Sequence, residues 1–272
     1  MTSTSGRVVI IIPARYESSR FPAKPLAPLR GSTGEPKPLI QRSWEAARRV
    51  PGIDAVYVAT DHPAIAEVAA GFGADVLMTS SDCRNGTERC AEAIAQLPDE
   101  PDLVVNLQGD APLTPPHFVT ALVDALGERI GTAAVATPCL RCDVAHLEKL
   151  REEERHGRVG GTTVVAAPDG RALYFSKRLI PHFPPEAISD DRTPVRLHIG
   201  VYAYTPAALE AYRAGRPGVL EQLEGLEQLR FLDIGLPVEV VEVAPPDWEI
   251  WELNNPSDTT PIEHALALMG LE

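Results

Sequence analysis

The sequence predicts an α/β fold built on a mostly parallel β-sheet, and three observations support this. Short apolar runs, typical of strands buried on both faces, recur along the first half of the chain. Each run is followed by a helix-like stretch, and strands that alternate with helices form right-handed parallel sheets. Polar clusters follow the ends of several runs, where ligands bind in open α/β sheets.

The first half of the chain has the more regular alternation. Pro38 suits the first turn of a helix, and Gly73 suits the end of one. The predicted strands are 8–12, 55–60, 74–78 and 102–108. The predicted helices are 38–50, 63–72, 87–97 and 116–126.

The second half is less regular. Residues 180–194 are polar and rich in proline, which predicts a mobile surface loop. The predicted strands are 132–138, 162–168, 171–176, 198–204 and 238–244, and the predicted helices are 220–232 and 261–269. Because no repeat or clear linker interrupts the chain, we expect one domain over 1–272 with an inserted mixed α/β lobe at about 140–200.

Composition restricts the classes of partner. The chain has 272 residues, a formal net charge of −13 and a sequence pI near 5.0. This acidic balance argues against nucleic acid or an anionic membrane as a partner, although a local basic pocket for a small anion is compatible with it. No apolar run is long enough to span a membrane. Residues 1–7 lack the basic and apolar segments of a signal peptide, so we expect a cytoplasmic protein.

The four cysteines are too few for a disulfide framework in a chain of this length. Cys139 and Cys142 form a C-x-x-C pair. A zinc site would need a second pair, but Cys83 and Cys90 are seven residues apart. A redox site would need the pair to open a helix. We therefore interpret them as ordinary thiols.

The first polar cluster, residues 13–26, follows the first predicted strand. Arg15, Arg20 and Lys24 lie within ten residues of one another among small residues, which suits an oligophosphate. The cluster does not match the phosphate loop of the common NTPases. Taken alone, it is equally compatible with a solvated basic loop.

Two further clusters follow later strands. Residues 85–89 open a helix, and Arg89 in its first turn opposes the helix dipole, so it requires a negative partner such as Glu88 or a ligand phosphate. Gln108 offers an amide for a base or ribose, and Asp110 suits Mg²⁺. A single Asp in a turn is usually a turn residue, but three clusters at one sheet edge favour a ligand site.

The ordered motifs resemble one family. They are P-A-R-Y-x-S-x-R-x-P-x-K-P-L from Pro13, G-T-E-R from Gly86 and Q-G-D-x-P from Gln108, followed by matches at 174–176, 198–204 and 226–230. Together they resemble the 3-deoxy-manno-octulosonate cytidylyltransferases, or CMP-Kdo synthetases, over about residues 8–262. The resemblance implies a nucleotidyltransferase-type, Rossmann-like fold and a homodimer, with the inserted lobe on the dimerisation and sugar side.

The resemblance also implies an activity. The enzyme would transfer CMP from CTP to the anomeric hydroxyl of 3-deoxy-D-manno-octulosonate (Kdo), for lipopolysaccharide or capsule synthesis, with Mg²⁺ as cofactor. A related sugar acid, 8-amino-Kdo or sialic-type, is the alternative substrate. A nucleotide-binding homologue without catalysis is the alternative from another class.

The implied site residues fall into four groups. The nucleotide would be bound by Pro13, Ala14, Arg15, Arg20, Lys24, Arg89 and Gln108. The sugar acid would be bound by Lys177, Arg178, His198, Tyr202, Glu227 and Gln228. The metal would be bound by Asp110 and Asn254, and the catalytic residues would be Lys24, Arg15 and Asp110.

The sequence departs from the family pattern at three places. Lys177, followed by Arg178, stands where the family has Arg after Tyr-Phe-Ser, and lysine lacks the planar fork of arginine. Asn254 stands where the family has a second metal-binding Asp. This leaves open whether Asn254 only shapes the turn while Asp247, Glu252 or Asp258 supplies the missing charge. Residues 31–37 form an insertion whose function the sequence does not indicate.

Overall fold

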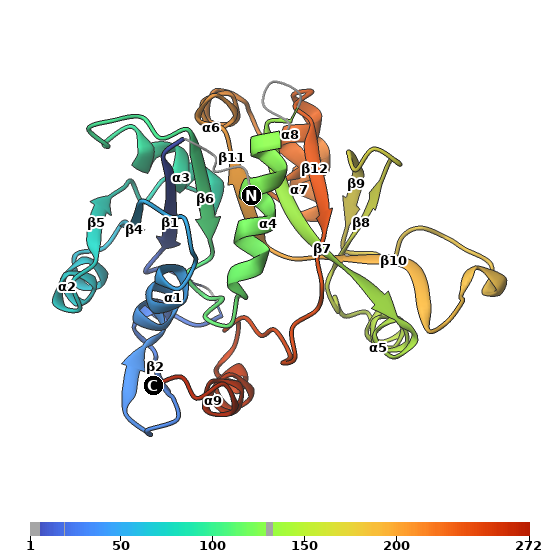
Figure 1. The fold of residues 1–272 in the computed structure, drawn as a ribbon, viewed down its shortest axis with the longest axis horizontal. Helices are drawn as coiled ribbons and strands as arrows, with labels where there is room; N and C mark the ends of the chain where they lie inside the picture. The colour runs from blue at the N-terminus through green and yellow to red at the C-terminus, as the bar shows by residue number, and fades with distance from the viewer. Residues whose placement is uncertain (1–5, 19, 129–132) are drawn as a thin grey trace.

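The computed structural model describes residues 6–18, 20–128 and 133–272. Within these residues, ten strands form one sheet (Figure 1). β12 (Val238–Glu242) pairs with β7 but is not part of the linear order of the other nine strands. The other strands follow in the order β5 (Asp75–Met78), β4 (Ala55–Thr60), β1 (Val8–Ala14), β6 (Leu103–Leu107), β11 (Val201–Tyr204), β7 (Val135–Asp143), β10 (Arg192–His198), β8 (Thr162–Ala166) and β9 (Ala172–Ser176).

The parallel part of the sheet comes from the first half of the chain. β1 lies between β4 and β6 and pairs parallel with both, with Val9 opposite Ala55 and Val8 opposite Leu103. The side chains of β1 alternate between two hydrophobic clusters, since Ile10 faces one and Ile11 faces the other. The predicted α/β class is confirmed, and the carboxyl ends of β1, β4 and β6 meet at one sheet edge.

Helices cover both faces of this sheet. On one face lie α1 (Leu39–Arg48), α2 (Pro63–Gly71) and α4 (Pro116–Glu128). On the other lie α3 (Gly86–Ile94), α6 (Pro206–Ala214) and α8 (Leu229–Asp233). The predicted helices of the first half begin and end within a few residues of the observed ones. Pro38, however, precedes α1 as the last residue of β3 instead of lying in the first turn.

The insertion at 31–37 forms the turn and second strand of a hairpin. Its strands are β2 (Pro28–Arg30) and β3 (Pro36–Pro38), which follow the short helix η1 (Lys24–Leu26). The C-terminal helix α9 (Thr259–Leu268) packs beside this hairpin at the lower end of Figure 1, in a hydrophobic cluster with Leu29 and Leu253. The C-terminal segment is thereby held next to the loop that carries Lys24.

The second half differs from the prediction in several elements. The single strand predicted at 198–204 is two strands, because β10 ends at His198 and β11 begins at Val201. The helix predicted at 220–232 is two helices, α7 (Val219–Glu224) and α8, separated by Gly225 with a φ of +61°. Helices α5 (Val144–Arg155) and α6 were not predicted. Residue 132 of the strand predicted at 132–138 lies outside the described residues.

The segment at 140–200 continues the main sheet. β8, β9 and β10 extend it antiparallel beyond β7, with α5 beside them, at the right-hand end of Figure 1. Residues 180–194, predicted as a loop, include the short helix η2 (Pro185–Ala187) and the start of β10. The role of this lobe in dimerisation stays a prediction.

Candidate active site

Lys24 and Asp110 form an ion pair at the carboxyl edge of the parallel strands. The Lys24 Nζ lies 2.6 Å from Asp110 Oδ2, and the two side chains are 15% and 24% exposed. Ala23 holds the chain in a left-handed conformation (φ 55°) directly before Lys24. Such strain in a residue other than glycine persists only where the surrounding contacts impose it. The sequence predicted both side chains for the site, and the structure brings them into direct contact.

The loops after β1 and β6 touch through Gly109. A Cβ built on Gly109 would lie 2.7 Å from the Pro13 carbonyl oxygen, so only glycine permits this approach. The Ser43 hydroxyl donates to the Gly109 carbonyl at 2.9 Å and fixes the loop against α1. Pro13 is half-buried and Ala14 is buried, so both position this loop through their backbone.

Arg15 and Arg20 are exposed on the loop after β1. The Arg20 Nη2 donates to Asn254 Oδ1 at 3.2 Å, which joins two predicted site residues that are 234 positions apart. Arg15 makes no ion pair within the described residues. Its guanidinium is therefore available to an anionic ligand, while Arg20 is tied to the C-terminal segment.

Arg89, predicted to help bind the nucleotide, is buried and paired within the protein. Its side chain is 3% exposed, and its Nη2 lies 2.9 Å from Asp61 Oδ2 while its Nη1 donates to Thr79 Oγ1 at 2.5 Å. The compensating partner is thus Asp61 and not Glu88. Asp61 also accepts the backbone N–H of Tyr16 at 3.1 Å. Arg89 and Asp61 together hold the loop after β1, and sequence reasoning missed Asp61.

The N-terminus of α3 is occupied by a carboxylate of the protein itself. Glu227 Oε2 accepts the Thr87 N–H at 2.9 Å, and Gln108 Nε2 donates to Glu227 Oε1 at 3.5 Å. Burial raises the pKa of Glu227. Asn85 accepts the Glu88 N–H at 2.8 Å and caps the helix. The structure therefore brings Gln108 and Glu227, predicted for different substrates, into contact.

Helix α8, which begins directly after Gln228, is anchored by a buried cation that sequence reasoning did not single out. Arg230 is 1% exposed, and its Nη2 lies 2.6 Å from Glu221 Oε1 while its Nη1 lies 2.9 Å from Glu88 Oε1. The guanidinium also stacks on the Tyr212 ring at 3.9 Å. This cluster ties α8 to α7 and α3.

His198, Tyr202 and Gln228 lie in the interior beneath this cluster. The His198 Nε2 is 2.9 Å from the Thr137 hydroxyl, and burial lowers the pKa of His198 to about 3, so its imidazole is neutral at physiological pH. The Tyr202 hydroxyl donates to Gln228 Oε1 at 3.2 Å. Among the residues that the structure describes, none accepts a hydrogen bond from the buried Gln228 Nε2, which leaves its N–H groups for a ligand or a water molecule.

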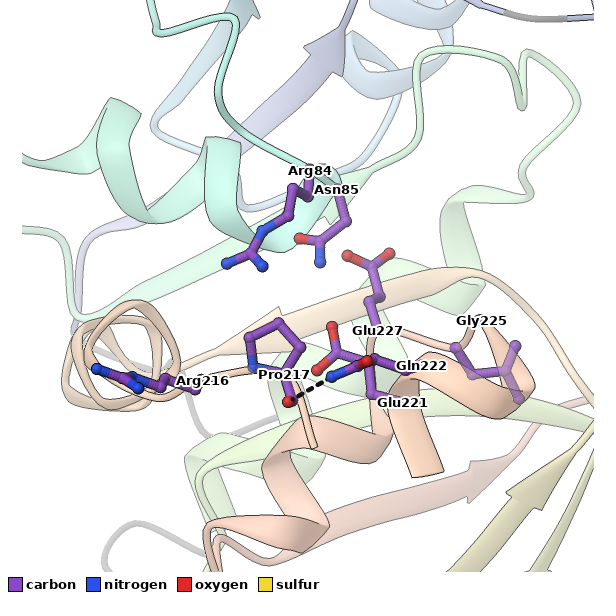
Figure 2. A pocket seen from close by; sticks show the side chains of 9 residues that line it. Arg84, Asn85, Arg216, Pro217, Glu221, Gln222, Gly225 and Glu227 are labelled. Carbon is purple, nitrogen blue, oxygen red and sulfur yellow. Dashed lines mark hydrogen bonds between the residues drawn. The ribbon is translucent and has the colours of Figure 1, made fainter. Parts of the chain in front are cut away.

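A cavity of about 800 Å³ opens beside Glu227. Figure 2 shows Arg84 and Asn85 on one side of it, opposite Glu221 and Glu227. Arg84 pairs with Glu88 at 3.2 Å. The cavity thus presents both cationic and anionic groups next to predicted sugar-binding residues.

The two basic residues at 177 and 178 point to different places. The Lys177 Nζ lies against Gly225, which lines the cavity. A Cβ added to this glycine would be only 3.0 Å from that Nζ. The Arg178 Nη1 lies 3.3 Å from Glu154 of α5, and its side chain is 72% exposed. Lys177 is therefore the residue of this pair that reaches the cavity rim.

The segment before α9 lies alongside Asp110. The Leu253 N–H donates to the Asp110 carbonyl oxygen at 2.9 Å. Burial, and the negative charge of Asp110, raise the pKa of Glu252 to about 7. Asp258 Oδ2 accepts the N–H groups of Asn254 and Asn255 at 2.9 and 2.7 Å, so Asp258 shapes this turn. Of the carboxylates that could supply the charge missing at Asn254, Asp258 is bound to this turn, while Glu252 feels the charge of Asp110.

Two negative findings apply to the described chain. Among residues 6–18, 20–128 and 133–272, no set of three or more His, Cys, Asp or Glu side chains is placed to hold a metal ion. No helix within the same ranges is both long and apolar enough to cross a membrane.

Comparison with known proteins identifies the family. Residues 9–240 match the family model described as "Cytidylyltransferase". The chain belongs to the cytidylyltransferase family. A 3-deoxy-manno-octulosonate cytidylyltransferase of Maricaulis maris is 38% identical to it over 97% of this chain and 98% of its own length. An 8-amino-3,8-dideoxy-manno-octulosonate cytidylyltransferase of Shewanella frigidimarina is also 38% identical, over 96% of this chain and 99% of its own length.

A solved structure supports the same assignment for this cytidylyltransferase. It is described as CMP:2-keto-3-deoxy-manno-octonic acid synthetase complexed with CTP. It has a TM-score of 0.79 and 33% sequence identity to this chain, and the match covers 97% of this chain and 98% of that one. The predicted family and nucleotidyltransferase-type fold are therefore confirmed.

Proposed function

We propose that this cytidylyltransferase transfers the CMP part of CTP to the anomeric hydroxyl of Kdo and releases pyrophosphate. The observation that carries the proposal is the contact between Lys24 and Asp110 where the ends of β1 and β6 meet. This is the edge at which open α/β sheets bind ligands. The pair joins a phosphate-binding cation to a metal-binding carboxylate in a chain whose relatives are named for this reaction.

The reaction needs positioning and charge neutralisation more than covalent chemistry. The anomeric oxygen of Kdo attacks the α-phosphorus of CTP, and the bond from that phosphorus to the bridging oxygen of pyrophosphate breaks. The Lys24 ammonium is placed to neutralise negative charge on the phosphates, and the exposed Arg15 guanidinium adds a second cation. Gln108 supplies an amide toward the nucleotide.

The residues near Asp110 fit a magnesium ion. Carboxylate and amide oxygens are the ligands that Mg²⁺ prefers, and the ion usually takes one or two carboxylates together with substrate phosphates. Asp110 and Asn254 provide a carboxylate and an amide at the edge where the triphosphate would lie. When bound, Mg²⁺ supplies positive charge to the phosphate oxygens.

The sugar acid would lie on the side of Gln108 that contacts Glu227. Glu227 is in contact with Gln108, and the cavity beside Glu227 is large enough for an eight-carbon sugar acid, since small-molecule sites span about 300–1,000 Å³. Lys177 at its rim offers a cation for the sugar carboxylate.

A second candidate substrate is 8-amino-Kdo. The relatives named for Kdo and for 8-amino-Kdo are equally similar to this chain, at 38% identity each. The carboxylates of Glu221 and Glu227 in the cavity suit an ammonium group, while Arg84 on the opposite side suits a hydroxyl. Comparing kcat/KM for the two sugar acids decides between them.

We also propose a cytoplasmic homodimer that serves lipopolysaccharide or capsule synthesis. The dimer would form through the lobe at 140–200, which extends the sheet beyond β7. Sedimentation of the purified chain at several concentrations tests this part independently of catalysis.

Pyrophosphate release tests the function. The assay combines CTP, UTP or ATP with Kdo, 8-amino-Kdo or a sialic acid, with and without Mg²⁺. We expect release with CTP, Mg²⁺ and an octulosonate together, and not when one of the three is omitted. Equal turnover with UTP would contradict the cytidylyl assignment, and CTP binding without release would indicate a non-catalytic homologue.

A further inference from the structure

The carboxylate of Glu224 binds the end of β9 at three points. Its Oε1 accepts from the Ser176 hydroxyl at 2.7 Å and from the Tyr174 hydroxyl at 3.4 Å. Its Oε2 accepts the backbone N–H of Lys177 at 2.9 Å. Glu224 is the last residue of α7, and hydrogen bonds to an ionised acceptor are stronger than those between neutral groups. These contacts therefore fix the backbone of Lys177 relative to α7.

The ammonium group of Lys177 is left free by this arrangement. Lys177 is exposed, and its Nζ has no hydrogen bond or ion pair to any residue that the structure describes. Both oxygens of Glu224 bind donors at the end of β9 instead. Glu224 thus holds the backbone of this lysine, while the charge at the end of its side chain stays available to a ligand.

Gly225 brings the same ammonium to the rim of the cavity. This glycine follows Glu224, ends α7 in the left-handed conformation with a φ of +61°, and lines the cavity. Because a Cβ at this position would lie 3.0 Å from the Lys177 Nζ, the missing side chain gives the ammonium its room. Two consecutive residues therefore act on Lys177, one through its backbone and one through its charged end.

We propose that Glu224 is a positioning residue for the sugar acid, which anchors Lys177 so that the ammonium meets the substrate carboxylate at the cavity rim. This inference rests on the proposed function and deepens it. Lysine carries a point charge on a flexible stem and lacks the planar fork of arginine, so its direction depends on how firmly its backbone is held. The anchor at Glu224 supplies that constraint.

A double-variant cycle in steady-state kinetics tests the proposal. The substrate is the octulosonate that the parent turns over, Kdo or 8-amino-Kdo, since both carry the carboxylate. We expect Lys177→Met and Glu224→Ala each to raise the KM for the sugar acid about tenfold, because each weakens one charge-assisted contact. The KM for CTP should change by less than about twofold. In the double variant, the KM for the sugar acid should stay within about twofold of that of Lys177→Met, because Glu224 then has no ammonium to position.

A merely structural role for Glu224 gives a different result. If Glu224 only fastens α7 to β9, its loss adds to that of Lys177, and the KM of the double variant rises about a hundredfold. The matched control is Leu223→Ala on the same helix, whose side chain is 78% exposed, and it should retain both KM values. If Glu224→Ala does not fold, Glu224→Gln replaces it, because the amide keeps one acceptor oxygen. We then expect a rise of about threefold that is likewise absent when Lys177 is already Met.

The outcomes distinguish this inference from the proposed function. Additive effects in the cycle, or a KM for CTP that rises as much as that for the sugar acid, would overturn the inference. It also fails if Lys177→Met keeps the parent KM for the sugar acid, whereas the transfer of CMP then stands with another residue on the carboxylate. If the parent releases no pyrophosphate with either octulosonate, the proposed function fails and the inference fails with it.

Discussion

Asp61 and Arg89 form an ion pair of 2.9 Å that joins the end of β4 to the start of α3. The same aspartate accepts the backbone N–H of Tyr16, and the Tyr16 ring stacks on His62 with centroids 3.8 Å apart. The loop that carries Arg15 therefore depends on a buried charge pair of which only Arg89 was predicted for the site.

Removal of Asp61 should destabilise the fold. Asp61→Ala leaves the Arg89 guanidinium buried without a counter-charge, and breaking such a pair costs roughly 3 kcal/mol. We expect a loss of that size in the free energy of unfolding, measured with urea. The control is Glu242→Ala, whose carboxylate is 43% exposed and pairs with Arg141 and Arg196, so its loss should stay below about 1 kcal/mol. Equal losses in the two variants would show that the Asp61 pair has no special role.

Lys24→Met should slow the chemical step. Removing one well-placed charge-stabilising group costs about 3 kcal/mol, or roughly a hundredfold in kcat. Stability should change little, because the Lys24 pair is partly exposed. Steady-state kinetics with CTP and Kdo measure the effect. Lys37→Met is the control, since Lys37 pairs with Glu45 at 2.8 Å away from the site. A kcat within about threefold of the parent would identify Lys24 as a surface charge.

His198 should make stability depend on pH. Its pKa in the folded protein, about 3, lies below the ordinary value of 6.5. The unfolded chain therefore binds more protons between these values, and the free energy of unfolding falls as the pH is lowered from about 6.5 toward 3, by up to about 1.4 kcal/mol per unit. His198→Gln, which cannot titrate, should show a shallower dependence in urea unfolding between pH 5 and 7. His264→Gln, at an exposed position, is the control, and a slope identical to the parent in both variants would refute the assignment.

The C-x-x-C pair should be chemically inert in the folded protein. Cys139 and Cys142 are buried within β7, and burial raises their pKa values to about 12 and about 11. Burial also raises the pKa of Cys83 to about 12, and that of Cys90. At pH 8 a disulfide reagent should release little chromophore from native protein and four equivalents after denaturation. Rapid release of two equivalents from native protein would point to a redox or metal-binding pair.

The sequence predicted the first half of the fold well because its signals are local. Runs such as 8–12 are apolar throughout, and the helices that follow begin or end at recognisable residues such as Asn85 and Gly73. In the second half, α5 carries many charges and buries little beyond Leu147, so its apolar pattern is weak. The split between β10 and β11 depends on which strands they pair with, which the sequence does not encode locally.

The site residues also divide into those that local sequence signals predict and those that only the fold brings together. Residue types and strand ends were sufficient to place Lys24 and Asp110 together. The partner of Arg89 was not predictable, because an Asp after a strand is normally a turn residue and Asp61 lies 28 positions away. The same holds for Glu227, which reaches the N-terminus of α3 from a segment 140 residues later. Such pairings arise only once the chain is folded.

³¹P nuclear magnetic resonance directly follows the bond that forms between CMP and a 2-keto-3-deoxy sugar acid in the proposed reaction. The purified chain is incubated with CTP, MgCl₂ and Kdo, and Lys24→Met serves as the comparison. We expect pyrophosphate and one new phosphodiester resonance to replace the three triphosphate resonances, and the variant to form this product about a hundredfold more slowly. Loss of CTP without a phosphodiester resonance, or a product that forms equally fast in the variant, would rule out the proposed transfer.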